Sequence, residues 1–233
     1  MQDNEQKTLG RIITLVVFIL IIAFGSYVIG FDQGKSSVKS TSNNKNSSQT
    51  VTVKSLTPIL GSPSAKLLIK EYADYQCPYC SEFNQTILPQ LESDYINTNK
   101  IKFQFINAPL LGDESVYSAA AAYCANDQGK YWQYHNELYL ITSQKNGDES
   151  HPVLNKGIFS QANLESYAST VGLNMNLFDQ CLNSSKYVST VVNEATAATQ
   201  AGVNGTPYFI IGNQPYEGLP SYSILQSLIQ AQL

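Results

Sequence analysis

The sequence predicts an α/β domain whose small sheet is interrupted by an all-helical insertion, and which follows a single N-terminal transmembrane helix. Three observations support this fold class. Apolar runs of strand length occur near both ends of the globular part, and roughly eighty residues between them have helical periodicity. Residues 12–31 form an apolar segment without a charged side chain. With 233 residues the chain can form one or two domains with a substantial core.

The N-terminal residues 1–31 are expected to be a membrane anchor or signal. The twenty uncharged residues from Ile12 to Phe31 would form a helix about 30 Å long, the thickness of a bilayer core. We expect an uncleaved anchor; the alternative is a signal peptide cleaved near Ala23-Phe24-Gly25. A buried core helix is disfavoured because the segment is apolar on all sides. Lysines on both sides leave its orientation undecided.

Residues 32–54 are expected to be a flexible tether, because Ser, Asn, Lys and Thr dominate the segment and cannot build a core. The sheet domain is assigned to residues 55–112 and 186–233, and the helical insertion to 113–185. In the sheet domain we expect strands over 66–73, 101–106 and 208–211, a helix from Cys77, and a closing helix over 221–232. Further helices are expected over 113–126, 130–141, 161–170, 175–182 and 186–201, with glycines between them.

The composition excludes several classes of protein. Hydrophobic residues make up 43% of the chain and charged residues only 14%, which excludes disordered, collagen-like and coiled-coil proteins. The net charge of −4 and the single arginine, Arg11, argue against a nucleic-acid-binding surface or bidentate phosphate recognition. Four cysteines are an even number in a chain large enough to fold without them, so structural and chemical roles are both open.

Cys77 and Cys80 form a CPYC motif directly after the first expected strand and at the start of a helix. Pro78 suits the first helical position, where its missing N–H costs nothing. Residues three apart on a helix share a side, and the helix N-terminus favours a thiolate at Cys77. Cys80 can then attack a mixed disulfide formed at Cys77, which is the chemistry of thiol–disulfide exchange.

Two other roles for the CPYC motif are weaker. A zinc site needs further ligands, but the remaining candidates are not paired at a ligand spacing; these are Cys124, Cys181, His135 and His151. A purely structural disulfide within the motif would close too short a loop to contribute much stability.

A second motif, Gly205-Thr206-Pro207, stands directly before the apolar strand YFII. Two interpretations are open. Pro207 is a plain turn proline, or it follows a cis peptide bond and exposes the backbone of Thr206. In the second case that backbone can pair with an extended peptide held beside the active sulfur.

Together, EYADYQCPYC, GVNGTPYFIIG and the helical block between them resemble the DsbA family of thiol oxidoreductases. The chain is most similar to the membrane-anchored or secreted DsbA-like proteins of bacteria, and the resemblance covers Ser55 to Leu233. It implies a thioredoxin fold with an inserted helical domain. It also implies that Cys77 is the exposed nucleophile, that Cys80 is the buried resolving cysteine, and that Pro207 is a cis proline facing the disulfide.

The resemblance implies roles for several further residues. Thr206 would lie in the substrate groove. Glu71 occupies the place of a buried carboxylate that exchanges a proton with Cys80 through water, although it could equally be an ordinary strand residue. Lys102 is the candidate for a lysine that accompanies this carboxylate, with surface solvation as the alternative. Tyr75 and Tyr79 are expected near the active sulfur, in contact with unfolded substrate.

The dipeptide Pro78-Tyr79 departs from the Pro-His of the best-known oxidase of the family. A tyrosine carries no positive charge to stabilise the thiolate, so Cys77 is expected to be less acidic and the protein less oxidising. Reductase or isomerase activity therefore stays open.

Cys124 and Cys181 each follow an apolar helical face and should lie in the core. Two lone core cysteines are one interpretation. We expect instead a structural disulfide inside the insertion, as in related DsbA-like proteins, and a redox shuttle is less favoured because neither cysteine looks exposed. The chain-entropy model gives this disulfide at most about 4 kcal/mol.

The expected function is that of an extracytoplasmic thiol–disulfide oxidoreductase that introduces disulfides into exported polypeptides. Its expected partners are those reduced polypeptides and a membrane quinone-linked reoxidase of the DsbB or VKOR type. Its expected location is the bacterial cytoplasmic membrane, as a single-pass protein with the C-terminal domain outside the cytoplasm. No metal or organic cofactor is implied. The alternatives are a reductase or isomerase, and a non-catalytic peptide-binding module.

Overall fold

The computed structural model describes residues 56–145 and 151–233. The expected anchor over 12–31 and the expected tether over 32–54 lie outside these residues. Within the two described ranges, no helix has both the length and the apolar character needed to cross a membrane.

A four-stranded mixed sheet forms the centre of the described chain, with the strand order β2-β1-β3-β4. The strands are β1 (Leu67–Ala73), β2 (Ile101–Asn107), β3 (Tyr208–Ile211) and β4 (Gln214–Glu217). β1 pairs in parallel with β2 and antiparallel with β3, and β3 pairs antiparallel with β4. In this register Glu71 of β1 lies between Phe105 of β2 and Phe209 of β3, at the centre of the sheet.

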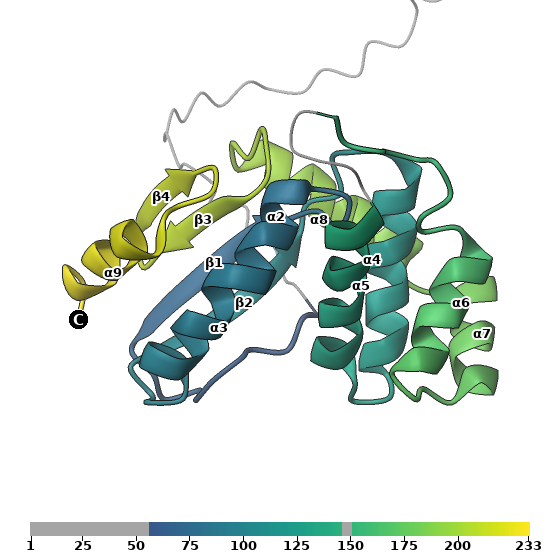
Figure 1. Ribbon diagram of the computed structural model, residues 1–233, viewed down its shortest axis with the longest axis horizontal. Helices are drawn as coiled ribbons and strands as arrows, with labels where there is room; N and C mark the ends of the chain where they lie inside the picture. The colour runs from purple at the N-terminus through teal and green to yellow at the C-terminus, as the bar shows by residue number, and fades with distance from the viewer. Residues whose placement is uncertain (1–55, 146–150) are drawn as a thin grey trace, which may run out of the picture. The chain divides into compact units, whose positions relative to one another are not determined.

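Both faces of the sheet are covered by helices (Figure 1). One face packs against a long helical segment, which comprises α2 (Pro78–Glu82), a π-helical turn (Phe83–Ile87), α3 (Leu88–Leu91) and a second π-helical turn (Glu92–Ile96). The C-terminal helix α9 (Tyr222–Gln230) packs its buried Leu225 and Ile229 into the same core. The opposite face carries a smaller cluster in which Tyr72 and Ile106 pack against Ala198 of α8 (Val188–Gln200). The active-site helix is therefore held against a rigid layer.

The helical insertion stands beside the sheet, on the right in Figure 1. It consists of α4 (Asp113–Asn126), α5 (Tyr131–Lys145), α6 (Gln161–Thr170) and α7 (Met175–Asn183). α4 is the centre of this subdomain: its face of small residues lets α5, α6, α7 and α8 approach closely. The predicted α/β sheet with an inserted helical block is thus confirmed.

The structure differs from the predicted elements at a few places. β4 is not among the predicted strands. It contains Pro215, which is tolerated because β4 is the edge of the sheet. The helix expected from residue 186 begins at Val188, because residues 184–187 form a turn in which the N–H of Val188 donates to the carbonyl of Ser185 at 3.1 Å.

Candidate active site

Cys77 occupies the N-cap of α2, where the chain turns from the end of β1 into the helix. Its N–H donates to the carbonyl of Asp74 at 3.0 Å, and Pro78 follows at the first helical position. Cys77 and Cys80 are both free thiols. Cys77 is 4% exposed and Cys80 is fully buried. The expectation of an openly exposed Cys77 is therefore wrong, because the turn before the helix and the Thr206 loop cover most of it.

The pKa values of the two thiols of the CPYC motif are shifted in opposite directions. Hydrogen bonding to the Cys80 side chain lowers the pKa of Cys77 below its ordinary value of 9.0, and this outweighs the effect of burial. Burial raises the pKa of Cys80 well above the same value. Cys77 is therefore the sulfur that loses its proton first, and Cys80 stays protonated until a base is close to it.

The Thr206-Pro207 loop meets Cys77 across the end of the sheet. The Sγ of Cys77 donates to the carbonyl oxygen of Thr206 at 3.3 Å, although the two residues are 129 positions apart. The Thr206–Pro207 peptide bond is cis, which is the second of the two interpretations that the sequence leaves open. The backbone of Thr206 thus lies directly beside the reactive sulfur.

Glu71 lies in β1, beneath the two cysteines, and is 1% exposed. Its Oε1 has no hydrogen-bond partner within the described part of the chain. Burial, followed by the electrostatic effect of Cys77, raises the pKa of this carboxyl well above its ordinary value of 4.5. Glu71 in turn contributes to the raised pKa of Cys80. A buried, incompletely bonded carboxyl with a raised pKa is suited to exchanging a proton with Cys80 and does not resemble a fully hydrogen-bonded strand residue.

Lys102 does not accompany Glu71. In the β1–β2 register Lys102 pairs with Leu68, whereas Glu71 pairs with Phe105. Because side chains alternate along a strand, Lys102 and Phe105 point to opposite faces of the sheet. The Nζ of Lys102 donates instead to the carbonyl of Pro63 at 2.9 Å. Of the two roles considered for Lys102, the structure shows the one at the surface, which the sequence favoured over a partnership with Glu71.

Of the two tyrosines expected near the active sulfur, only Tyr79 is available to a substrate. Tyr79 follows Pro78 in α2 and is 41% exposed. Tyr75 is 1% exposed; its ring packs against Phe105, and its hydroxyl lies 2.9 Å from Nδ1 of His135. The expectation that Tyr75 contacts substrate is wrong, because the turn after β1 directs its side chain into the core.

Asp74 also belongs to the site, although the CPYC motif alone does not mark it. This buried carboxylate accepts from the N–H of Gln76 at 2.8 Å and from the N–H of Leu111 at 2.9 Å. Its backbone carbonyl receives the N–H of Cys77. Burial raises its pKa to about 6. The sequence does contain a hint of this role, because an Asp whose side chain accepts from the backbone N–H two residues later is typical of a turn.

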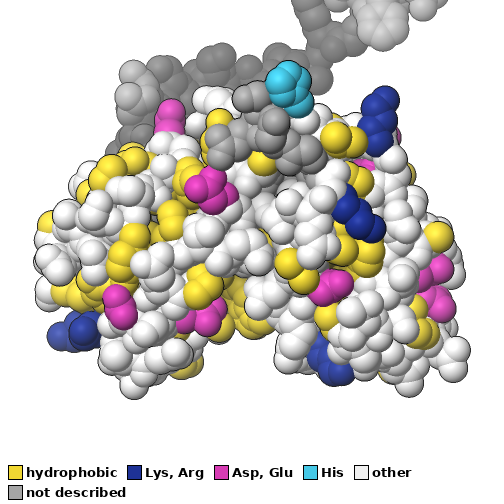
Figure 2. Space-filling model, viewed as in Figure 1, with side chains coloured by type: hydrophobic (Ala, Val, Ile, Leu, Met, Phe, Trp, Pro, Cys, Tyr) yellow, Lys and Arg dark blue, Asp and Glu magenta, His cyan; other side chains and the backbone are white. Residues whose placement is uncertain are grey.

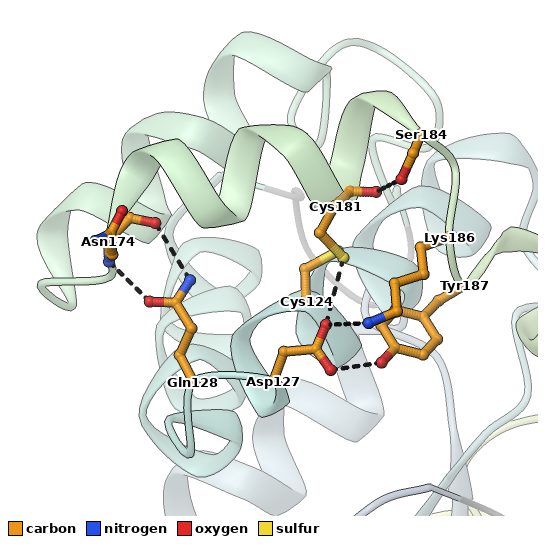
Figure 3. Close-up of a disulfide and its surroundings, with 8 residues drawn as sticks. All are labelled: Cys124, Asp127, Gln128, Asn174, Cys181, Ser184, Lys186 and Tyr187. Carbon is orange, nitrogen blue, oxygen red and sulfur yellow. Dashed lines mark hydrogen bonds and ion pairs between the residues drawn. A yellow bond between two sulfur atoms is a disulfide. The ribbon is translucent and has the colours of Figure 1, made fainter.

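The second pair of cysteines forms the disulfide predicted from the sequence (Figure 3). It joins Cys124 near the end of α4 to Cys181 in α7, with the Cα atoms 5.8 Å apart. Beside it, Asp127 accepts from the Nζ of Lys186 at 2.8 Å and from the hydroxyl of Tyr187 at 2.6 Å. Because both sulfurs are bonded to each other, neither can act as a zinc ligand together with the CPYC motif.

The raised pKa of Glu71 leads to a pH-dependent prediction. The pKa of Glu71 is higher in the folded state than the value near 4.5 expected in the unfolded state. The stability that this difference contributes is fully present below the unfolded pKa, and it is lost as the pH rises from there through the folded pKa. Glu71→Gln should therefore become progressively more stable than the wild type as the pH rises above 4.5, by about 1.4 kcal/mol per pH unit until the folded pKa is reached. Urea unfolding at several pH values, with the cysteines reduced, measures the difference.

The exposed Glu217 of β4 offers a matched control for this measurement. Glu217→Gln should change the stability by only a small amount. A difference between wild type and Glu71→Gln that stays constant from pH 5 to pH 8 would contradict the assignment of a strongly raised pKa to Glu71.

Comparison with known proteins agrees with this geometry. The family model described as Thioredoxin matches residues 54–231. The disulfide bond formation protein D of Bacillus subtilis is 23% identical over 178 residues, which are 76% of this chain and 77% of that protein. A Bacillus anthracis protein of the same name, qualified as probable, is 30% identical over 149 residues, 63% of this chain and 62% of its own length.

Solved structures show the same fold. The crystal structure of oxidised BdbD from Bacillus subtilis matches with a TM-score of 0.63 at 22% identity, covering 75% of this chain and 91% of that one. Alpha-DsbA1 from Wolbachia pipientis matches with a TM-score of 0.64 at 23% identity, covering 76% and 92%. At this identity the likeness shows the fold, a thioredoxin fold with inserted helices.

Proposed function

The chain belongs to the thioredoxin family as a DsbA-like thiol–disulfide oxidoreductase, and from this premise we propose that it oxidises the thiols of exported polypeptides at its CPYC motif. The observation that carries the proposal is the unequal acidity of the two thiols. Cys77 has a lowered pKa and lies beside the Thr206 backbone, whereas Cys80 is buried with a raised pKa. An exchange enzyme needs this asymmetry, because one sulfur must form and release mixed disulfides while the other resolves them.

The proposed reaction starts from the Cys77–Cys80 disulfide. A thiolate of the substrate attacks Sγ of Cys77, the bond between the two enzyme sulfurs breaks, and Cys80 leaves as a thiolate that takes a proton. Glu71 is placed to supply this proton through water, since burial raises the pKa of its carboxyl, which favours the protonated form, and the carboxyl interacts with Cys80. A second substrate thiolate then attacks the substrate sulfur of the mixed disulfide, and Cys77 leaves as a thiolate. The substrate loses two electrons and the enzyme pair gains them.

The acidity of Cys77 favours this direction of transfer. A leaving thiol with a low pKa departs more readily, so the second step releases Cys77 rather than the substrate sulfur. The free thiolate is stabilised at the N-terminus of α2. Both effects favour the reduced enzyme, which makes the oxidised form a donor of disulfides.

The surface beside Cys77 suits unfolded polypeptides of varied sequence. The backbone of Thr206 offers main-chain pairing, and the half-exposed ring of Tyr79 offers an apolar contact. On the face of the molecule shown in Figure 2, charged side chains are scattered among uncharged ones.

We place the protein at the bacterial cytoplasmic membrane, with residues 12–31 as a single-pass anchor, 32–54 as a tether and the catalytic domain outside the cytoplasm. The apolar N-terminal segment and the Cys124–Cys181 disulfide support this location, because structural disulfides persist in oxidising compartments. The reduced pair would be returned to the disulfide by a quinone-linked membrane reoxidase of the DsbB or VKOR type, which would accept its two electrons.

The reduction potential of the Cys77–Cys80 pair tests the direction of transfer. Equilibration of the soluble domain with glutathione buffers, with the thiol state read by alkylation, should give a value towards the oxidising end, about −120 mV. Because Tyr79 carries no charge, a value somewhat below this still fits an oxidase. A value near about −270 mV would contradict the proposal and favour the alternative, a reductase.

A further inference from the structure

Gln76, the residue before Cys77, is held more firmly than a turn residue requires. Its side chain is buried, and its Nε2 donates to Oγ of Ser115 at 2.8 Å and to Oδ1 of Asn155 at 3.3 Å. Its Oε1 accepts from the backbone N–H of Asn155 at 2.7 Å. One amide therefore joins the turn before the nucleophile to the first turn of α4 and to the segment between α5 and α6.

The segment that carries Asn155 is built to meet Gln76. Asn155 has a φ of +53°, a conformation that asparagine tolerates better than most residues. Its Nδ2 donates to the carbonyl of Leu111 at 2.7 Å, and its Oδ1 also accepts from the N–H of Glu114 at 3.1 Å. A Cβ on Gly112 would lie 2.4 Å from the Asn155 Nδ2, so only glycine there leaves room for this side chain.

Glu114 completes the connection. Its two carboxylate oxygens accept from the backbone N–H groups of Gly157 and Phe159, at 2.6 and 2.7 Å. Residues 155–159 are thereby attached to the start of α4 at both ends. We call Gln76, Glu114, Ser115 and Asn155 the amide clamp. The clamp links a surface segment of the insertion to the residue adjacent to the reactive cysteine.

We propose that the amide clamp positions Cys77, with Gln76 as the positioning residue and Asn155 as the residue that holds it. This rests on the proposed function, since it concerns the same cysteine. Cys77 keeps its acidity through hydrogen bonds that depend on its place at the N-cap of α2. Asp74 also holds the turn, because it accepts from the N–H groups of Gln76 and Leu111 and its carbonyl receives the N–H of Cys77. Releasing the Gln76 side chain removes the additional bonds that fix the residue next to Cys77 to Ser115 and Asn155. Small displacements of a reacting group have large effects on rate.

Gln76→Leu removes the amide and keeps the size of the side chain. We expect the apparent pKa of Cys77, read from the pH dependence of its alkylation, to rise by about half a unit or more, and the exchange rate at pH 7 to fall about tenfold. Asn155→Gly should act in the same direction with a smaller effect, because glycine accepts the positive φ and keeps the N–H that reaches Gln76. If Gln76→Leu does not fold, the pKa and the exchange rate of Cys77 in Asn155→Gly alone test the proposal.

The chain offers two matched controls. Gln128 repeats the reciprocal bonding far from Cys77, since its Oε1 accepts from the N–H of Asn174 at 2.8 Å and its Nε2 donates to the Asn174 carbonyl at 3.2 Å (Figure 3). Gln128→Leu should leave the pKa and the exchange rate of Cys77 unchanged. The Cys124→Ala/Cys181→Ala variant is less stable but retains the clamp, so it should also keep the pKa of Cys77.

The ionisable groups that interact with Cys77 include Glu71, Asp74, Cys80 and Tyr139, and none of these variants changes them. A shift in the pKa of Cys77 therefore reports its position. The inference is overturned if the wild type exchanges disulfides and Gln76→Leu and Asn155→Gly match Gln128→Leu within twofold in rate. A wild type that exchanges no disulfides would instead overturn the proposed function, a separate result.

Discussion

Cys77→Ser should abolish disulfide exchange. The serine hydroxyl is not ionised near neutral pH and cannot form the disulfide with Cys80, so both the oxidised donor and the leaving group of the second step are lost. We expect the rate of substrate oxidation to fall by about 10³-fold or more, to the uncatalysed background. The measurement is the loss of free thiols from a reduced polypeptide under anaerobic conditions, with wild type and variant preoxidised in the same way.

Cys80→Ser separates the roles of the two cysteines. Cys77 keeps its place at the N-cap of α2, but no second sulfur is left to release a bound partner. With glutathione disulfide, this variant should accumulate a stable adduct on Cys77 that mass spectrometry detects. Retention of substrate oxidation by Cys77→Ser would contradict the assignment of Cys77 as the reacting sulfur.

The second large effect is expected on stability. Cys124→Ala/Cys181→Ala removes the disulfide between α4 and α7, which closes a loop with a sequence separation of 57. The chain-entropy model gives a loss of up to about 4 kcal/mol in the free energy of unfolding. For a domain of this size that lowers the Tm by about 10 °C. Calorimetry or circular dichroism on the variant and the wild type, with Cys77 and Cys80 reduced in both, measures the shift.

The control for this prediction is Cys77→Ser, which keeps the disulfide in the insertion and should melt within about 2 °C of the wild type. The variant without the disulfide should still oxidise substrate at temperatures at which it is folded, since the disulfide lies away from Cys77. A Tm within about 2 °C of the wild type for the Cys124→Ala/Cys181→Ala variant would show that the disulfide adds little to the folded state.

The local parts of the site could be predicted from the sequence because each has a strong short-range signal. Pro78 at the first helical position marks the start of α2, and with it the N-cap location of Cys77. The apolar run before the motif marks β1. The pairing of Cys124 with Cys181 agrees with the two apolar helical faces on which these residues stand.

The sequence does not determine to which face of the sheet a strand residue points, because this depends on the register between neighbouring strands. The last residues of β1, including Glu71, Tyr72 and Ala73, are buried on both faces, so polarity does not alternate there and does not indicate which way Glu71 points. For the same reason, the sequence left two roles open for Lys102. Its face follows from the pairing of β2 with β1, which the sequence of either strand alone does not contain.

The covering of Cys77 and the burial of Tyr75 come from contacts between distant parts of the chain. The loop at Thr206, the start of α4 and the segment around Asn155 all close on the turn after β1. Each contact is specific, but none has a periodic pattern. Gln76 and Asn155 are 79 residues apart, and only the fold brings their amides together.

The central claim is that the Cys77–Cys80 disulfide is donated to polypeptide thiols while the Cys124–Cys181 disulfide stays closed. A single-turnover experiment tests it most directly: the oxidised protein is mixed anaerobically with a reduced polypeptide, and the thiols of both are alkylated and located by mass spectrometry. The account predicts that two substrate thiols disappear for each protein molecule and that Cys77 and Cys80 alone become alkylated. Substrate thiols that stay unchanged, or alkylation of Cys124 and Cys181, would contradict it.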